Sequence, residues 1–192
     1  DLYAANAAWG MIRDGFASRY KTAERARIQA GDAMALAFPD ESFHIVHSTV
    51  TLEHISTPES ALREAYRVLK PGGLAYFEVG PWFAPDGGHS LCTLDCPWGH
   101  VRLTEAEFEE YVLTHRPHEA PAAMDFYRHG FQTPRLTMGE IESQIVRSAF
   151  RIVDWHESRQ AYVDHYRWLT PDLLADCQRV HPSVTVRDLT VS

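Results

Sequence analysis

Two short apolar runs with an amphipathic stretch between them give the clearest pattern in the chain. Residues 43–48 and 74–79 are rich in β-branched and aromatic side chains, which predicts two strands. Residues 58–70 have the spacing of a helix, which follows an N-cap at Thr57 and ends at the Pro-Gly-Gly of residues 71–73. The face of this helix that we expect to be buried consists of Leu62, Ala65, Tyr66 and Leu69.

Strand, helix and strand in this order, joined by turns of a few residues, predict a parallel crossover unit. Further strands are predicted at residues 27–30 and 150–156, so we expect an α/β fold in which neighbouring strands are parallel. Ligands of such sheets bind outside the carboxyl ends of the strands. Those ends are Asp32, residues 48–49 and residues 80–81, and we expect them to meet in one crevice.

The rest of the chain is less regular. Helices are predicted from caps and composition at residues 4–25, 104–113, 137–149 and 170–181. Residues 81–103 and 115–135 are rich in proline and glycine and are predicted to be irregular, and residues 184–191 alternate weakly, which favours an approach to a strand. Because residues 81–103 follow the carboxyl end of a strand, we expect a lid or a substrate wall there.

Composition narrows the classes of function. The 192 residues carry a formal net charge of −8 and are 45% hydrophobic, which is ordinary for one globular domain. The acidic balance disfavours nucleic acid as a partner, and no apolar run approaches the roughly 18 residues that span a membrane. Three cysteines do not make an even disulfide framework, so we expect a cytoplasmic protein.

The segment at residues 31–73 reads GDAMALAFPDESFHIVHSTVTLEHISTPESALREAYRVLKPGG. It resembles the middle of a class I S-adenosylmethionine-dependent methyltransferase of the type 11 kind. The resemblance implies a Rossmann-like α/β fold, with a mostly parallel sheet flanked by helices. It also implies S-adenosylmethionine as cofactor and transfer of its methyl group to a small-molecule acceptor.

The resemblance also implies which residues meet the cofactor. They are Asp1, Asp32, Ala33, Met34, Ser48, Thr49 and His54. In the family the acid at the position of Asp32 meets the adenine N6, the next backbone N–H meets a ring nitrogen, and an acid at the position of Asp1 binds the ribose hydroxyls. The alternatives are a turn-forming role for Asp32, a solvated terminal Asp1 and a structural role for His54.

His89, Cys92, Cys96 and His100 form a second candidate cluster. Their spacing differs from the Cys-x-x-Cys of common zinc sites, and we assign no metal. The stretch instead resembles the loop of a methyltransferase subgroup, in which His89 and His100 shape the acceptor pocket or act as a general base. The alternative is that both histidines form hydrogen bonds within an ordered loop. Five aromatic residues are candidates for the pocket or for the core: Trp82, Phe83, Trp98, Phe126 and Tyr127.

The chain departs from the family at its start, because no strand with a glycine-rich loop precedes Asp1. We therefore interpret residues 1–192 as one partial, N-terminally truncated methyltransferase domain, with residues 81–135 as a lid or substrate-side insertion. Three other functions remain open: a methyltransferase-fold module that binds without turnover, another Rossmann-like enzyme such as a nicotinamide oxidoreductase, and a zinc-binding interaction domain.

The missing glycine-rich loop leads to a first prediction. That loop normally contacts the carboxylate end of the cofactor, so residues 1–192 expressed alone are expected to bind S-adenosylmethionine weakly or not at all. Isothermal titration calorimetry measures this directly. Tight binding by the 192-residue chain would contradict the interpretation that it lacks part of the cofactor site.

Overall fold

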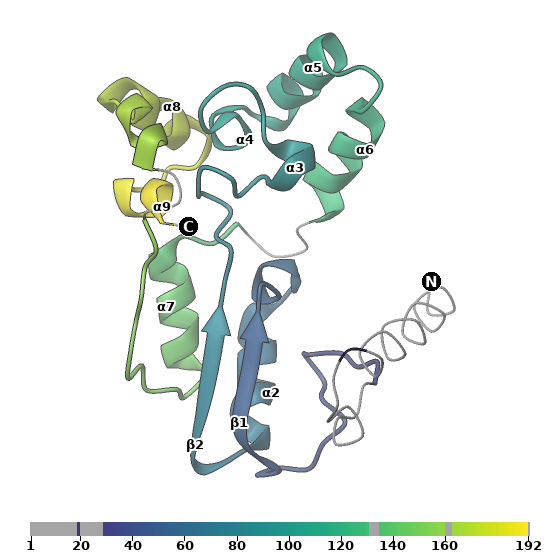
Figure 1. The fold of residues 1–192 in the computed structure, drawn as a ribbon, viewed down its shortest axis with the longest axis vertical. Coiled ribbons are helices and arrows are strands. Elements are labelled where there is room, and N and C mark those ends of the chain that lie inside the picture. The colour runs from purple at the N-terminus through teal and green to yellow at the C-terminus, as the bar shows by residue number, and fades with distance from the viewer. Residues whose placement is uncertain (1–18, 20–28, 131–134, 160–162, 192) are drawn as a thin grey trace.

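The computed structural model describes Arg19 and residues 29–130, 135–159 and 163–191. The molecule has two parts, which we call the α/β half and the helical half (Figure 1). The α/β half contains β1 (Phe43–Thr49), α2 (Pro58–Val68), β2 (Leu69–Glu78) and α7 (Met138–Arg147). The helical half contains α3 (His89–Cys92), α4 (Gly99–Arg102), α5 (Glu105–His115), α6 (Ala120–Asp125), α8 (Pro171–Val180) and α9 (Val186–Thr190). The helix predicted at residues 4–25 falls on residues outside the described ranges, apart from Arg19, which is helical.

The crossover unit predicted from the sequence is confirmed. β1 and β2 are parallel neighbours, and the ladder runs from the pair Ile45–Leu74 to the pair Thr49–Glu78. β2 starts earlier than predicted, because the backbone is already extended at Leu69, and the ladder carries an irregularity between Phe43 and Ile45. Gly72 has a φ of 77°, a conformation that favours glycine, so the Pro-Gly-Gly segment reverses the chain at the start of β2.

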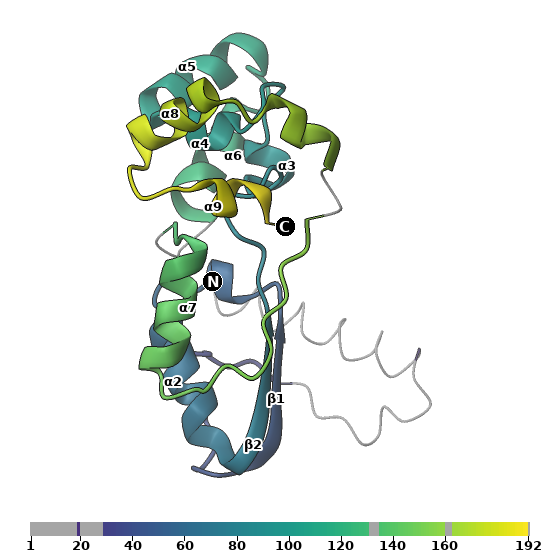
Figure 2. The ribbon, with the colours of Figure 1, turned by 90° about the vertical axis from the view of Figure 1, so that its left-hand side faces the viewer.

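The two helices of the α/β half lie on the same side of the sheet (Figure 2). Leu52, Ala61 and Leu62 form a small buried cluster between α2 and the sheet. Residues packed against this cluster come from four segments: Ala33, Met34, Ile55, Phe77, Val79, Ile145 and Phe150. Three apolar side chains on the opposite face of the strands are exposed: Ile45, Leu74 and Tyr76.

The helix α2 buries most of the face that its periodicity predicts. Leu62 and Ala65 are buried, whereas Tyr66 is 49% exposed and lies edge-on against Phe150, with ring centroids 5.3 Å apart. Pro58 begins the helix as predicted, although Thr57 makes no side-chain capping bond. The sequence pattern therefore identified the helix and its packing side, but misplaced the tyrosine.

Two predicted strand segments are wrong or lie partly outside the described ranges. Residues 150–156 form no ladder among the described residues, because Phe150 packs against Tyr66 and Phe77 in the α2–sheet interface. Of the segment at residues 27–30, the described residues 29 and 30 are irregular, and an isolated antiparallel bridge follows at Asp32. The tail, predicted to approach a strand, contains the helix α9 at Val186–Thr190.

A capping box explains the tail: Thr185 and the buried Asp188 bond each other's backbone N–H groups at the start of α9. The capping boxes predicted at Thr104 with Glu107 and at Thr137 are likewise present, and they open α5 and α7. These short polar signals are local, so they predict helix starts even where the apolar pattern is weak.

The segments at residues 81–103 and 115–130 are more ordered than predicted. They contain α3, α4 and α6, together with a π-helical turn, η3 (Phe126–Gly130). Each of these helices is too short to be stable alone, and burial in a common core supplies their stability. That core includes Phe83, Val101 and Phe108, with exposed fractions of 1% or less. None of the described helices is long and apolar enough to cross a membrane.

Arg67 attaches the loop before β1 to α2. Its guanidinium donates to both carboxylate oxygens of Glu64, to Asp40 Oδ1, and to the carbonyls of Phe38 and Leu36, at 2.7–3.0 Å. Glu64 Oε2 in turn accepts a hydrogen bond from the Leu36 N–H at 2.8 Å. This network fixes residues 36–40, and with them the position of the loop that carries Asp32.

His100 lies in the core of the helical half. It is 1% exposed, and its Nε2 lies 2.9 Å from the carbonyl oxygen of Trp82. Burial lowers the pKa of this imidazole to about 4. His100 is therefore neutral at pH 7 and contributes to packing between α4 and the segment after β2.

The Arg67 network predicts a loss of stability on substitution. Arg67→Met removes every one of these donors, and we expect the melting temperature to fall by roughly 4–8 °C, as for the loss of hydrogen bonds to charged groups in a chain of this size. Arg63→Met is the matched control, because Arg63 contacts Glu59 alone in an exposed pair and should shift the melting temperature by less than about 2 °C. Equal shifts for the two variants in a thermal scan would show that the network does not hold the loop.

Burial of His100 predicts that stability falls as the solution is acidified. The imidazole has a pKa near 6.5 when unfolded and about 4 when folded, so between these values the unfolded chain binds a proton that the folded chain does not. The contribution of His100 to the free energy of unfolding is therefore fully present above pH 6.5 and is lost as the pH falls toward 4. We expect the free energy of unfolding to fall by about 2 kcal/mol between pH 7 and pH 5 for this reason.

Urea unfolding at pH 7 and pH 5 measures this effect. His100→Gln should reduce the pH dependence of the unfolding free energy by that amount, because its amide can still meet the Trp82 carbonyl and does not titrate. His115→Gln, at an exposed position on α5, serves as control. An unchanged slope in the His100 variant would refute the neutral, buried state of this histidine.

Candidate functional site

The carboxyl ends of β1 and β2 lie side by side and begin the candidate site. The Val50 N–H donates to the Glu78 carbonyl at 2.9 Å, which extends the ladder past the end of β1. Val50 has a φ of 48°, in the left-handed region that a β-branched residue rarely adopts. The chain then turns at Thr51, whose hydroxyl donates to the Thr49 carbonyl at 2.9 Å. Backbone strain of this kind concentrates at functional sites, so this turn is a candidate for one.

Glu53 links the two strand ends. It lies in the short helix η2 (Leu52–His54) and is 6% exposed. Its Oε1 accepts a hydrogen bond from the Gly80 N–H at 3.2 Å. A Cβ at Gly80 would lie 3.1 Å from that same oxygen, so a side chain there would crowd the contact. Glu53 thus holds the turn after β1 against the turn after β2.

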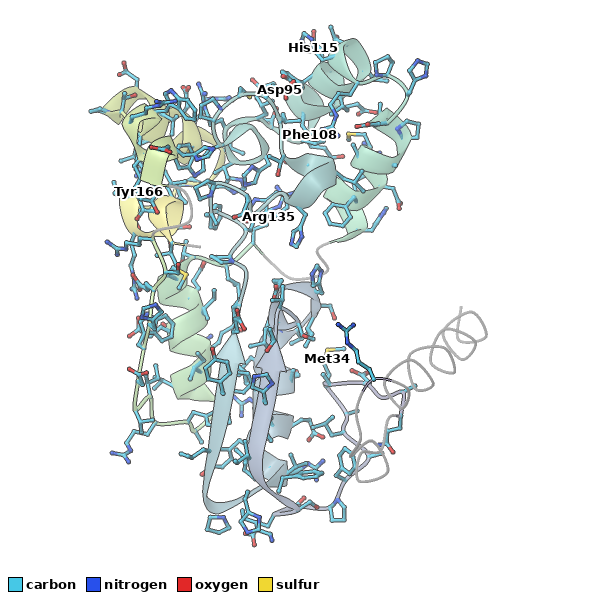
Figure 3. The ribbon with its side chains drawn as sticks, in the orientation of Figure 1. Met34, Asp95, Phe108, His115, Arg135 and Tyr166 are labelled. Carbon is cyan, nitrogen blue, oxygen red and sulfur yellow. The ribbon has the colours of Figure 1, made fainter. Side chains whose placement is uncertain are left out.

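The loop with the predicted adenine-binding residues packs beside this turn. Ala33 and Met34 contact the cluster around Leu52, and the Ser56 hydroxyl lies 3.7 Å from the Met34 sulfur. Figure 3 shows Met34 on the loop beside β1. Asp32 is exposed, and its Oδ1 accepts a hydrogen bond from the Met34 N–H at 2.8 Å, which closes an Asx turn. The second carboxylate oxygen takes no part in that turn.

Ser48 and Thr49 end β1 as predicted. Thr49 is exposed, and its hydroxyl lies 3.3 Å from His47 Nε2. Among the described residues no hydrogen bond joins Asp32 to either hydroxyl, and it is Ala33 and Met34 that pack against the cluster of Leu52 beyond the turn. Asp1 lies outside the described residues.

His54 and His89 come together although they are distant in the sequence. Their ring centroids are 5.5 Å apart, and His54 Nδ1 lies 3.1 Å from the Gly130 carbonyl oxygen. This contact joins η2 of the α/β half to α3 and η3 of the helical half. Burial lowers the pKa of His89, and the charge of His54 lowers it further. A neutral imidazole at this junction has the protonation state that a general base needs.

His100 takes no part in this pair. Its enclosed position and its bond to the Trp82 carbonyl support the structural alternative for this histidine. Cys92 is fully buried, with its Sγ 3.6 Å from the Ala123 carbonyl, and burial raises the pKa of its thiol to about 12. Among the described side chains, no three His, Cys, Asp or Glu residues gather where they could hold a metal ion.

A narrow pocket lies where the two halves meet. Its walls come from η2, from the start of α2, from the turn after β2, from the segment before α7 and from α7 itself. The residues that line it are Leu52, Glu53, Pro58, Leu62, Val79, Gly80, Pro81, Trp82, Arg135, Leu136, Ile141 and Gln144. The space inside is about 30 Å³, enough for one or two water molecules. Trp82 was a candidate from the sequence, but Arg135 and Gln144 were not.

Arg135 is the residue that the sequence analysis missed. Its guanidinium packs against the rings of Trp82 and Tyr127, 4.1 Å and 4.2 Å from the two centroids, and these rings are themselves in edge contact. Figure 3 shows it between the α/β half and the helical half. Nothing in the sequence around Arg135 marks it, because its partners come from a turn and a π-helical segment whose approach depends on tertiary structure.

Comparison with known proteins agrees with this architecture. The family described as methyltransferase domain matches residues 8–77, which include β1, α2 and almost all of β2. No solved structure matches the chain.

The relatives found are methyltransferases by name. A ubiquinone/menaquinone biosynthesis C-methyltransferase UbiE from Ruegeria sp. is 51% identical over 43 residues, which cover 22% of this chain and 17% of the relative. The UbiE of Xanthomonas oryzae pv. oryzae is 46% identical over 59 residues, covering 28% and 23%. An uncharacterized methyltransferase of Mycobacterium avium is 41% identical over 58 residues, covering 30% and 23%. The chain thus spans less than a quarter of the length of each of these relatives.

The matched segment coincides with the part of the structure in which strand, crossover helix and parallel strand meet. The predicted adenine-side loop packs against the turn after β1 in that same segment. Through this segment, the chain is similar to the methyltransferase domain family and to the relatives named above.

Proposed function

We propose that the protein transfers a methyl group from S-adenosylmethionine to a small-molecule acceptor. One observation carries the proposal: within the matched segment, Ala33 and Met34 pack against the turn that follows β1. In an open α/β sheet this is where a nucleotide-like ligand binds. The relatives named for ubiquinone/menaquinone biosynthesis support a small organic acceptor in preference to a macromolecule.

The described residues offer groups that suit an adenosyl cofactor. Asp32 uses one carboxylate oxygen in its own turn, which leaves the other able to accept from the adenine N6 amine. The Ala33 N–H is the proposed donor to a ring nitrogen, and Met34 is the proposed apolar neighbour of the base. Ser48, Thr49 and His54 are the proposed neighbours of the methionine portion, and Asp1 is the proposed ribose ligand.

The bound cofactor would supply an activated methyl group on its sulfonium. The protein's own task is then to align the acceptor and to exclude water. His89 is the better candidate for a general base, because burial keeps it neutral, and His54 touches its ring. A base assists an alcohol or phenol acceptor more than an amine or a carbon nucleophile. His100 is enclosed in the core, so we do not assign it a chemical step.

A cytoplasmic location forms part of the proposal. All three cysteines are free thiols, and the acidic net charge disfavours anionic polymers as partners.

The experiment is best done on the complete gene product that contains this chain. We expect transfer of a tritiated methyl group from S-adenosylmethionine into small molecules of a cell extract. Calorimetry with S-adenosylhomocysteine and with S-inosylhomocysteine, which has an oxygen in place of the N6 amine, then tests the adenine contact. Asp32→Asn keeps a turn-forming oxygen but replaces the other with a donor. This substitution should weaken the binding of S-adenosylhomocysteine about tenfold and strengthen the binding of S-inosylhomocysteine.

The outcomes separate the alternatives. Asp125→Ala removes an exposed carboxylate on α6 and should change neither affinity. An equal loss for both ligands in Asp32→Asn would mean that the turn, not the adenine contact, was damaged. Cofactor binding without methyl transfer would favour the non-catalytic binding module. A complete gene product that binds no S-adenosylhomocysteine would overturn the proposed function.

A further inference from the structure

We propose that Arg135, which packs against Trp82 and Tyr127 beside the pocket at the end of β2, binds a carboxylate on the methyl acceptor. This inference rests on the proposed function, because it names the chemical class of the acceptor. It assigns an anion-binding residue to the pocket between the α/β half and the helical half.

The guanidinium is held rigidly. Trp82 and Tyr127 both pack against it, with their ring planes 73° apart, and its Nη atoms donate to the Tyr127 hydroxyl at 3.0 Å and to the Tyr127 carbonyl at 3.3 Å. The remaining N–H groups of the guanidinium can donate to other partners. An arginine fixed in this way presents a planar fork of donors, the geometry that matches a carboxylate.

Arg135 has no carboxylate partner among the described residues. Several other half-buried arginines do have one in an ion pair: Arg67, Arg102, Arg116 and Arg187. The other charged side chain that lines the pocket, Glu53, accepts from the Gly80 N–H, and burial, followed by the charge of Arg135, lowers the pKa of His181 to about 4. Burying a cation without a paired anion costs free energy, and an anionic ligand at Arg135 would supply the missing partner.

The pocket offers further groups that fit an acceptor with a carboxylate on an apolar body. Most of its wall is apolar, from Leu52 and Val79 to Ile141. Gln144 Oε1 faces inward from α7, buried and without a hydrogen-bond partner among the described residues, so it can accept from a ligand or a water. Because the space inside is small, a terminal carboxylate enters and the apolar body remains toward the opening.

The second charged side chain of the pocket is a carboxylate, so the pocket has one positive and one negative side. Glu53 is held at the end of β2 by the Gly80 N–H, and its carboxylate repels an anion. A carboxylate therefore has one favourable place, at Arg135. Such a polarity orients a bound molecule with respect to the strand ends, where the cofactor residues are proposed.

Binding of a simple aromatic carboxylate tests the assignment without any methyl transfer. The probes are benzoate and its neutral isostere benzamide, measured by ligand-observed NMR on the complete gene product. We expect benzoate to bind at least about tenfold more tightly than benzamide. Arg135→Met should abolish this preference, and Arg135→Lys should retain part of it, because lysine keeps the charge and loses the fork.

Arg128→Met is the matched control, because Arg128 is a nearby arginine already paired with Glu105 and Glu109, and it should leave benzoate binding unchanged. Thermal scans of each variant check that it folds. Equal binding of benzoate and benzamide, or an equal loss in the Arg128 and Arg135 variants, would overturn the assignment. If benzoate binds through Arg135 but the protein binds no S-adenosylhomocysteine, the proposed function fails while the anion site stands.

Discussion

The parallel pairing of β1 with β2 is the constraint on which the rest of the structure depends. A parallel pair requires a crossover, and α2 supplies it by packing Ala61 and Leu62 against the sheet. The pairing places two turns at one edge, where Glu53 bonds Gly80 and draws them together. Met34 packs beside the turn after β1, and Arg135 lines the pocket at the turn after β2, so both candidate groups lie at that edge.

The helical half converts this edge into an enclosed site. Trp82 ends the short turn after β2, packs against Arg135 and accepts at its carbonyl from His100, so one residue connects the strand end with the pocket and with the helical core. Burial in this core keeps His100 neutral, because it disfavours the charged form of the imidazole. Arg135 and Glu53 are the charged side chains that line the pocket, in a chain whose net charge is −8.

Sequence patterns predicted the elements whose causes are local. The apolar runs of β1 and β2, the periodicity of α2 and the capping boxes at Thr104 and Thr137 each depend on a few neighbouring residues. α3, α4 and α6 span four to six residues, too few to show a period, and only the shared core stabilises them. Residues 150–156 resemble a strand in composition, yet Phe150 is engaged by two other rings. The pairing of His54 with His89 depends on tertiary contacts that no local pattern encodes, and so does the packing of Trp82 and Tyr127 against Arg135.

The uncovered side of the two strands has a consequence for how the chain behaves in solution. Ile45, Leu74 and Tyr76 present 56–67% of their surfaces to water, and within the described part of the chain β1 and β2 pair only with each other. Each strand therefore has an outer edge with unpaired backbone donors and acceptors, next to an exposed apolar face. Two such molecules can pair edge to edge through these strands. A high concentration of the protein therefore favours aggregation, unless another strand or a helix covers that face.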